Sequence, residues 1–423
     1  MASIQLISKT NYAIQTVVPL PLPSTPLLAP DTIRIRSRIL GLTTNLLKCA
    51  KLGAARLPGL DWYNIWPFPF ATAPEPFNDP SKYCRIGAWG YSEVVESTIP
   101  SLTVGTFLYG YQPIGSVPEE LKLKAVDDVP GGWVEISERR KDMVGIYNFY
   151  LETETDDEND RNRESKGWDA LMQPLFCTSW MLNRFVFDWT GEESNRVHPL
   201  GVDSDLPWTK EDANLKGATV ILLAASAKTG LAFAQQLRHG RPEFEQPSKI
   251  VAVGSEDSKA FTASTGWFDE ILGYHDVDDA PGLLLDSGNK PAKVLLVDFG
   301  ARGGAADRWA TALRPMCERL QVVLLGADPS FNGQIELLSL ARQPGSGVTQ
   351  SNAGRQWEMA REMLGARKYT DEFAAAWNAF KAEGAVKGLN LVWGRGIDGF
   401  KEGWDVLARG EGRSDVGLVY GRV

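Results

Sequence analysis

The sequence has few of the residues that bind metals or cross-link a chain. Its three histidines are dispersed. Its four cysteines are also widely separated, and no two of them form a Cys-x-x-Cys pair: Cys49, Cys84, Cys177 and Cys317. This spacing argues against a disulfide framework and against a structural zinc site, and it favours a reducing compartment such as the cytoplasm.

Long hydrophobic runs and an excess of basic charge are also missing. No uncharged apolar segment approaches ~20 residues, so we expect no transmembrane helix, and the N-terminus lacks the pattern of a signal peptide. The 44 basic and 53 acidic side chains give a net charge of −9, which argues against nucleic acid or an anionic membrane as the main partner. We therefore expect a cytoplasmic protein that acts on a small molecule. Its 423 residues are enough for two or three domains.

Residues 217–240 contain the most informative pattern. The apolar run Thr219-Val220-Ile221-Leu222-Leu223 does not alternate with polar residues, which is typical of a strand buried on both faces of a parallel sheet. Small residues follow at 224–227, and a helical pattern begins near residue 229. The free N–H groups at such a helix start favour a phosphate. An ordinary buried strand and helix without a ligand is the alternative.

The expected fingerprint of this turn is G-x-G-x-x-G. If Ala224, Ser226 and Gly230 are taken as its counterparts, two of the three glycines are replaced. Four further apolar runs alternate with helical segments, which predicts a doubly wound parallel sheet. These runs lie at residues 249–254, 267–272, 293–300 and 321–326.

Other segments give simpler expectations. Residues 32–38 alternate with a basic face, as in a solvated edge strand. The proline-rich residues 59–80 carry aromatic side chains that either wall a ligand pocket or form a satellite core. The charged run 152–166 is expected to be a surface insertion. Helices are expected at 168–186, 355–381 and 399–407, and strands at 389–393 and 416–420.

Several segments together resemble the medium-chain dehydrogenase/reductase superfamily. The runs TVILLAASAKTGLAFAQQL, IVAVGSEDSKAFTASTGWFDEIL, VLLVDFG and VVLLG are similar to its coenzyme half, and residues 86–111 are similar to its GroES-like barrel. The Ser/Ala/Lys-rich turn and the segment Phe-Cys-Thr-Ser-Trp-Met-Leu also resemble a fungal and bacterial group within it, described as a domain of unknown function.

The resemblance implies an α/β protein with a GroES-like β-barrel catalytic domain and a Rossmann-type doubly wound parallel sheet. Residues 1–185 would form the first part of the catalytic domain and residues 186–345 the coenzyme domain. Residues 346–423 would return to the catalytic domain. Homodimers are common in this superfamily, so a homodimer is possible here.

Zinc enzymes of the superfamily hold their metal with Cys, His and a further Cys or carboxylate. The corresponding positions fall near residues 43–45, without a Cys, and 87–89, without a His. Only Cys177 lies near the third position, and we expect it to be a small buried residue. We therefore predict no catalytic zinc, and the resemblance is to the zinc-free quinone and enoyl reductases. In these, NADPH delivers hydride to an activated C=C or C=O.

The same resemblance suggests the residues of the site. The phosphate turn would contribute Ser226, Ala227, Lys228, Thr229 and Gly230, and the later strand ends would contribute Ser255, Lys259 and Gly326. Lys228 either balances phosphate charge or is a solvated lysine at a helix start.

Ser255 and Lys259 would hold the 2′-phosphate of NADP, although Glu256 and Asp257 lie beside them and oppose this preference.

The catalytic candidates are Asn45 and Tyr109. Asn45 either contacts substrate or cofactor near the nicotinamide or caps a turn. Tyr109, or Tyr111 in its place, either donates a proton or belongs to the barrel core.

The resulting prediction is a metal-free, NADP-dependent oxidoreductase that reduces an enoyl or quinone type C=C, or a C=O. The alternative is a relative that has lost hydride transfer and serves as a small-molecule binding protein, an isomerase or a C–C lyase. The replaced glycines support this alternative, because the Cβ atoms of Ala224 and Ser226 stand where the backbone should approach a pyrophosphate closely.

Overall fold

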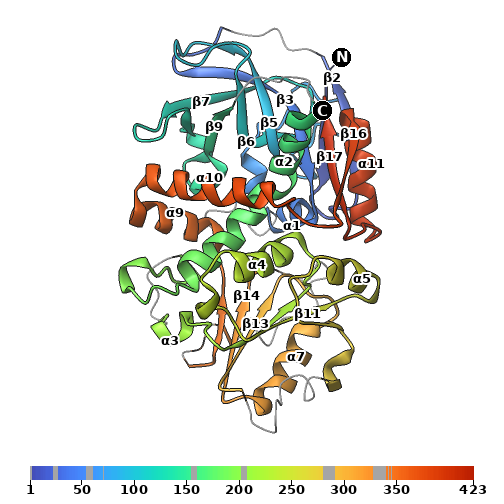
Figure 1. Cartoon of the computed structure of the whole chain (residues 1–423). Coiled ribbons are helices and arrows are strands. Elements are labelled where there is room, and N and C mark those ends of the chain that lie inside the picture. The colour runs from blue at the N-terminus through green and yellow to red at the C-terminus, as the bar shows by residue number, and fades with distance from the viewer. Residues whose placement is uncertain are drawn as a thin grey trace. The chain divides into compact units, whose positions relative to one another are not determined.

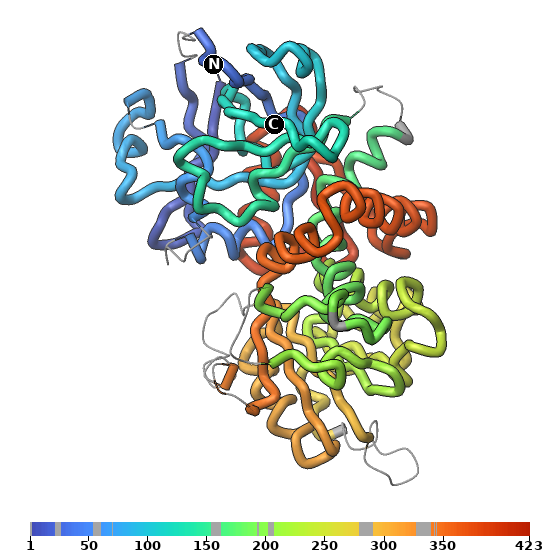
Figure 2. The backbone as a smooth tube through the Cα atoms, turned by 90° about the vertical axis from the view of Figure 1, so that its left-hand side faces the viewer, coloured from blue at the N-terminus to red at the C-terminus, as the bar shows by residue number. Residues whose placement is uncertain are grey.

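The computed structural model divides the chain into two compact units. The barrel unit comprises Met1–Pro174 and Asn390–Val423, and the sheet unit comprises Leu175–Leu389. The residues described are 2–21, 27–53, 61–69, 71–153, 160–201, 207–279, 291–326, 340–341, 343 and 345–423. The return to the barrel unit therefore begins at Asn390 and not at residue 346. Figure 2 shows this return as the red end of the chain among the blue strands.

Six strands of the barrel unit close on themselves, in the order β3-β5-β6-β9-β8-β7 and back to β3. This is the expected GroES-like barrel. Two strands from the end of the chain continue the sheet from β3 (Figure 1). In chain order the strands of this sheet are β3 (Thr32–Leu42), β5 (Gly87–Ser97), β6 (Phe107–Pro113), β7 (Glu119–Ala125), β8 (Gly132–Glu135), β9 (Phe149–Thr153), β16 (Asn390–Arg395) and β17 (Val416–Gly421).

The described part of the barrel unit also contains a small antiparallel sheet, three α-helices and short 3-10 helices. The small sheet has the order β2-β1-β4. Its strands are β1 (Ala2–Ser8), β2 (Gln15–Leu20) and β4 (Tyr83–Cys84). The helices are α1 (Thr44–Leu52), α11 (Gly396–Ala408) and the first part of α2 (Asp160–Met181), which continues past the unit boundary at Pro174.

Strand β3 is not the solvated edge that its basic face predicts. It pairs with β5, β7 and β17 and lies inside the sheet. The basic face is accommodated there because neighbouring strands supply acidic partners, so that Arg34 is only 4% exposed and pairs with Glu96 and Glu120. Cross-strand pairing of opposite charges thus replaces contact with water.

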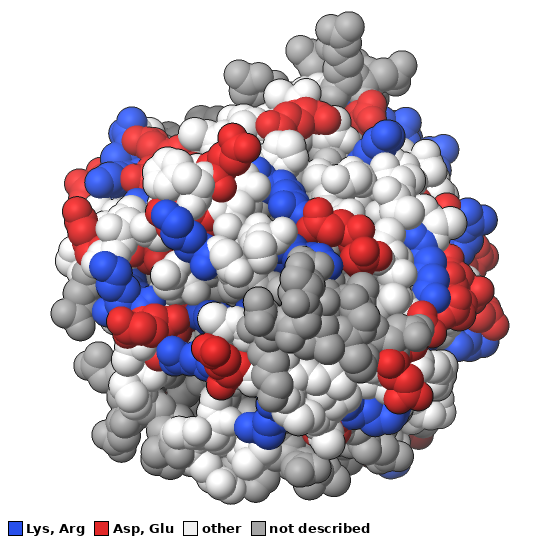
Figure 3. Space-filling model, turned by 60° about the horizontal axis from the view of Figure 1, so that its bottom comes forward, with Lys and Arg blue, Asp and Glu red and all other residues white. Residues whose placement is uncertain are grey.

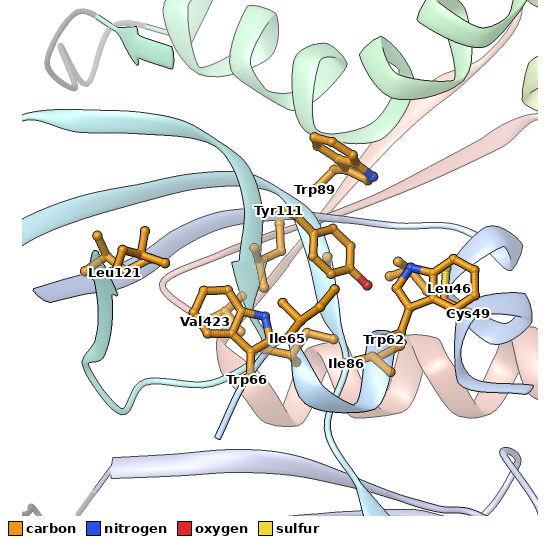
Figure 4. Close-up of a cluster of buried hydrophobic side chains, with 14 of the residues drawn as sticks. Leu46, Cys49, Trp62, Ile65, Trp66, Ile86, Trp89, Tyr111, Leu121 and Val423 are labelled. Carbon is orange, nitrogen blue, oxygen red and sulfur yellow. The ribbon is translucent and has the colours of Figure 1, made fainter. Parts of the chain in front are cut away.

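The aromatic side chains of the proline-rich segment belong to the core of the barrel unit. Trp62 and Trp66 are buried in one cluster with Tyr111 (Figure 4). Packing is so close that a Cβ added at Gly87 would lie 2.6 Å from the ring of Tyr111 and 2.8 Å from the indole nitrogen of Trp66. The core interpretation of this segment is therefore confirmed for its described residues, and Phe70 lies outside them.

The sheet unit is built on a six-stranded parallel sheet of order β12-β11-β10-β13-β14-β15. The first strand in sequence thus lies near the middle, with strands added outward on both sides, as in doubly wound nucleotide-binding domains. The strands are β10 (Thr219–Leu223), β11 (Lys249–Gly254), β12 (Glu270–Gly273), β13 (Lys293–Asp298), β14 (Arg319–Leu324) and β15 (Val348–Gln350).

Helices cover both faces of this sheet, which explains the unbroken apolar runs of its strands. On one face, Ile221 and Leu223 pack in a cluster with Trp309 and Leu313 of α7. Helix α4 lies on the other face (Figure 1). The helices of the unit are α3 (Lys210–Ala213), α4 (Lys228–His239), α5 (Glu256–Ser264), α7 (Ala305–Leu313), α9 (Ala353–Leu364) and α10 (Ala366–Ala382), with the last part of α2.

Two predicted boundaries differ from the structure. Strand β12 begins at Glu270 and not at residue 267, because the carboxylate of Asp269 accepts a 2.7 Å hydrogen bond from the Ile250 amide in place of a main-chain partner. The charged run 152–166 is only partly an insertion, since α2 begins at Asp160. Residues 154–159 lie outside the described residues.

The buried ion pair between Arg85 and Glu119 generates a prediction about stability. Arg85 Nη2 lies 2.6 Å from Glu119 Oε1, and both side chains are less than a tenth exposed. Arg85→Met would leave the carboxylate buried without its cation, and we expect it to lower the free energy of unfolding by about 3–5 kcal/mol, measured by urea denaturation. The control Arg413→Ala breaks an exposed pair with Asp415 and should cause no measurable change. Equal stability of R85M and wild type would contradict this.

Candidate functional site

The turn after β10 joins the carboxyl ends of three neighbouring strands. The Ala225 amide donates to the Val253 carbonyl at the end of β11, at 3.2 Å, and the Phe299 amide donates to the Leu223 carbonyl, at 3.1 Å. Ala224 has φ of +54°, a left-handed conformation that favours glycine. Ala224 therefore has a backbone conformation that usually belongs to glycine, and its Cβ adds strain to this turn.

Gly230 is required by the packing of α4 against the turn. A Cβ at this position would lie 2.9 Å from the Ala225 carbonyl oxygen and 3.2 Å from the Ala224 carbonyl oxygen. This is the role of the third glycine in the nucleotide fingerprint, which lets the helix approach the strand. However, Ala224 to Gly230 spans seven residues and the fingerprint spans six. A fingerprint that ends at Gly230 begins at Ala225, so Ala224 and Ser226 are not the counterparts of its first two glycines.

The start of α4 has the groups that an anion needs. Ala227 is the N-cap and Lys228 the first helical residue, so the amide groups of the first turn have no acceptor within the helix. The hydroxyl groups of Ser226 and Thr229 make no hydrogen bond within the part of the chain that the structure describes. The Ser179 hydroxyl of α2 donates to the Thr229 carbonyl at 2.8 Å, which holds this turn in place. We call residues 224–230 the cradle.

Asp298, at the end of β13, supports the neighbouring loop. Its buried carboxylate accepts hydrogen bonds from the amides of Gly300 at 2.8 Å and Ala301 at 2.7 Å. Its carbonyl accepts from Leu325 and Gly326 at the end of β14. A Cβ at Gly326 would overlap the main chain of Phe299, so packing against this loop already requires a glycine there. Sequence reasoning missed Asp298, although an acidic residue directly after an apolar strand is a usable signal.

Ser255 and Lys259 lie at the end of β11, but both have partners on the protein. The Ser255 hydroxyl donates to Ser258 Oγ at 3.2 Å. Lys259 Nζ lies 2.8 Å from Glu256 Oε1 and 2.9 Å from Asp276 Oδ2. Hydrogen bonds to Glu256 and Asp276 raise the pKa of Lys259. Hydrogen bonds from the Gly273 amide and from Lys259 lower the pKa of Asp276.

Asn45 lies in the first turn of α1 in the barrel unit. The N-cap of this helix is Thr43, so the structure does not support the capping interpretation of Asn45. The side chain is half-buried, and its amide nitrogen lies 4.0 Å from the sulfur of Cys49, one turn further along. Burial raises the pKa of Cys49 to about 12, so this thiol stays neutral. The predicted contact of Asn45 with substrate or cofactor stays a prediction.

The two candidate tyrosines have different environments. Tyr111 is fully buried, and its hydroxyl accepts a 3.2 Å hydrogen bond from the Gly87 amide, which confirms the core role weighed for it. Tyr109 is half-buried, its ring stacks on Trp89, and its hydroxyl donates to the Asp169 carbonyl at 3.2 Å. The proton of Tyr109 is therefore engaged by the protein, and its role as a proton donor stays a prediction.

Cys177 is a buried residue with a protein partner, as expected. Its sulfur lies 3.3 Å from the Tyr369 hydroxyl, and burial raises its pKa to about 12. Among the described residues, no three His, Cys, Asp or Glu side chains gather in a way that could hold a metal ion. The described helices also include none that is long and apolar enough to cross a membrane.

Acidic and basic side chains are interspersed over the face drawn in Figure 3. This face therefore shows no broad field of one sign.

The closed barrel and the parallel sheet together define a two-unit α/β protein with the medium-chain dehydrogenase/reductase fold. The structure of CurA from Vibrio vulnificus in complex with NADPH is similar, with a TM-score of 0.57 and 14% identity over 100% of this chain and 99% of that one. A mutant form of enoyl thioester reductase from Candida tropicalis gives a TM-score of 0.51 and 10% identity over 99% of each chain. At these identities the likeness shows the fold.

The chain belongs to the family described as "Protein of unknown function (DUF2855)", whose model matches residues 40–413. A comparison with curated protein sequences gives no match.

The close approach at Gly230 generates a second prediction. Although alanine is the better helix former by about 1 kcal/mol, Gly230→Ala should destabilise the protein by about 1–3 kcal/mol, because the Ala225 main chain cannot move away cheaply. Thermal and urea unfolding would measure this. The matched control is Gly399→Ala in α11, where a Cβ would meet Tyr420 at an ordinary 3.6 Å. We expect this control to be stabilising, and a stabilising G230A would contradict the packing argument.

Proposed function

We propose that the protein is an NADP-dependent reductase that works without a metal and reduces an activated C=C, or a C=O, of a small molecule. The observation that carries this proposal is the cradle, with its left-handed Ala224, the close approach at Gly230 and the donors of the first turn of α4. Proteins of the same fold include CurA, solved with NADPH, and an enoyl thioester reductase. The described residues suit a dinucleotide, because amide groups, two hydroxyl groups and Lys228 surround one helix start.

When bound, NADPH would supply the hydride, and the chain would supply binding and hydrogen bonds. We assign the pyrophosphate to residues 225–230 and the 2′-phosphate to Ser255 and Lys259. Gly326 would contribute by allowing the β14 end to pack against the loop after β13. This arrangement uses the carboxyl edge of the parallel sheet, where doubly wound proteins bind their ligands.

In the barrel unit we assign Asn45 to the oxygen of the substrate. Hydride addition to an enone or enoyl compound leaves negative charge on that oxygen, and a fixed N–H donor stabilises it. Among the described residues, the Asn45 amide nitrogen makes only a 4.0 Å contact with the sulfur of Cys49, so it can donate a hydrogen bond to a substrate oxygen. Tyr109 would donate a proton only after releasing the Asp169 carbonyl.

A second function is favoured by one specific observation. In the six-residue fingerprint that ends at Gly230, Ala225 and Ala227 stand at the first two glycine positions, and their Cβ atoms narrow the approach of a pyrophosphate. The alternative is therefore a binding protein or a non-redox enzyme such as an isomerase or a C–C lyase.

Coenzyme binding distinguishes the two functions. We expect NADPH to raise the melting temperature of the wild type and to show enhanced fluorescence on binding. Ser226→Asp places a negative charge in the cradle. The charge interacts favourably with the dipole of α4, so the fold should persist. The same charge repels the pyrophosphate, so the Kd for NADPH should rise at least about tenfold. Ala366→Asp in the first turn of α10 is the matched control and should bind NADPH normally. No response of the wild type to NADPH or NADH would favour the second function.

Catalysis gives a separate test. With the best substrate from a panel of enones, quinones and enoyl thioesters, Asn45→Ala should lower kcat by about 10²-fold and leave the Kd for NADPH unchanged, because the donor acts on charge that develops during reaction. Asn64→Ala changes an exposed asparagine of the same unit and should have wild-type kcat. An N45A variant with normal kcat would remove Asn45 from the catalytic residues.

A further inference from the structure

We infer that Asp276 limits how strongly this protein prefers NADPH over NADH, by competing with the 2′-phosphate for Lys259. The inference rests on the proposed coenzyme function and names a residue that the sequence resemblance does not assign.

The segment that carries Asp276 lies directly beside the end of β11. Strand β12 pairs with β11 up to Gly254 and Gly273, and the Tyr274 amide donates to the Gly254 carbonyl at 3.0 Å. Asp276 follows in the 3-10 helix Asp276–Asp279. Its carboxylate thus reaches the place where the sequence resemblance puts the ribose of the coenzyme.

Lys259 is shared between two carboxylates at this place. Its ammonium lies 2.8 Å from Glu256 Oε1 and 2.9 Å from Asp276 Oδ2. A Cβ at Gly273 would overlap the Glu256 carboxylate, so the missing side chain makes room for the cluster. The cluster of one cation and two anions has a net charge of −1.

The two carboxylates are not equal competitors. Oδ2 of Asp276 also accepts a 2.7 Å hydrogen bond from the Gly273 amide, and the side chain is 30% exposed. Glu256 is 69% exposed, and no main-chain amide of the described residues anchors its carboxylate. An anchored carboxylate loses little entropy when it holds the lysine, whereas an exposed glutamate can swing into water. Asp276 is therefore the stronger competitor.

This competition affects one coenzyme and not the other. The 2′-phosphate of NADPH brings a charge of about −1.5 to −2 beside a cluster that is already negative, as for other phosphomonoesters. NADH brings a neutral hydroxyl to the same place. Asp276 consequently weakens NADPH binding by repulsion and by occupying Lys259, while it leaves NADH almost unaffected.

The test measures the Kd of NADPH and of NADH by fluorescence titration of the full chain. Asp276→Asn keeps an oxygen that can accept from the Gly273 amide and removes only the charge. We expect this variant to lower the Kd of NADPH about 3–10-fold and to change the Kd of NADH less than twofold. The decrease in the Kd of NADPH should become smaller as the salt concentration is raised. Glu256→Gln should give a smaller gain. In a Lys259→Met background, Asp276→Asn should raise NADPH affinity less than it does in the wild type, because only the repulsion is relieved and no lysine is released for the phosphate.

Each other outcome has a definite meaning. Unchanged or weaker NADPH binding by D276N, with wild-type NADH binding, would overturn the inference and leave the reductase proposal intact. Equally weaker binding of both coenzymes by D276N, together with a lower melting temperature, would also overturn the inference. Asp276 would then serve to stabilise the turn at Gly273. If the wild type binds neither coenzyme, the proposed function itself fails.

Discussion

The candidate site depends on the close packing of α4 against the turn after β10, which leaves no room for a Cβ at Gly230. With any larger side chain at Gly230, the first turn of α4 would move away from the Ala225 carbonyl, and the amide groups of that turn would lose their common direction. The Ser179 hydroxyl and the left-handed Ala224 hold the same turn from its other sides. A preorganised cluster of N–H donors is what makes a helix start an anion site.

A second constraint shapes the carboxyl edge of the sheet unit. Asp298 uses its side chain for the loop after β13 and its carbonyl for the end of β14, so one buried residue connects two strand ends. Lys259 and Asp276 make a comparable connection between α5 and the end of β12. The side chains that stabilise the carboxyl edge of the sheet are thus the same ones that a ligand bound at this edge would contact. For this reason the charge of Asp276 affects the choice of coenzyme.

Much of the architecture could be predicted from the sequence. The apolar runs at β10, β11, β13 and β14 identify a parallel sheet, because only strands covered on both faces dispense with polar alternation. Local sequence periodicity gave a wrong prediction where residues distant in the chain change the environment of a strand. Strand β3 has the pattern of an edge strand, yet it lies inside the sheet because Glu96 and Glu120 come to Arg34 from other strands.

The candidate site was only partly predictable. Local sequence order determined which residues line the turn after β10, since a strand, a tight turn and a helix are contiguous in the chain. The partners of these residues were decided by the tertiary structure: Ser179 for Thr229, Asp276 for Lys259, and Asp169 for Tyr109. Hydrogen bonds and ion pairs act over a few ångströms in space, whereas these partners are separated by 50, 17 and 60 positions along the chain. The sequence by itself determined the strand-and-helix framework through hydrophobic burial, and only the folded chain decided which polar groups are already engaged and which remain for a ligand.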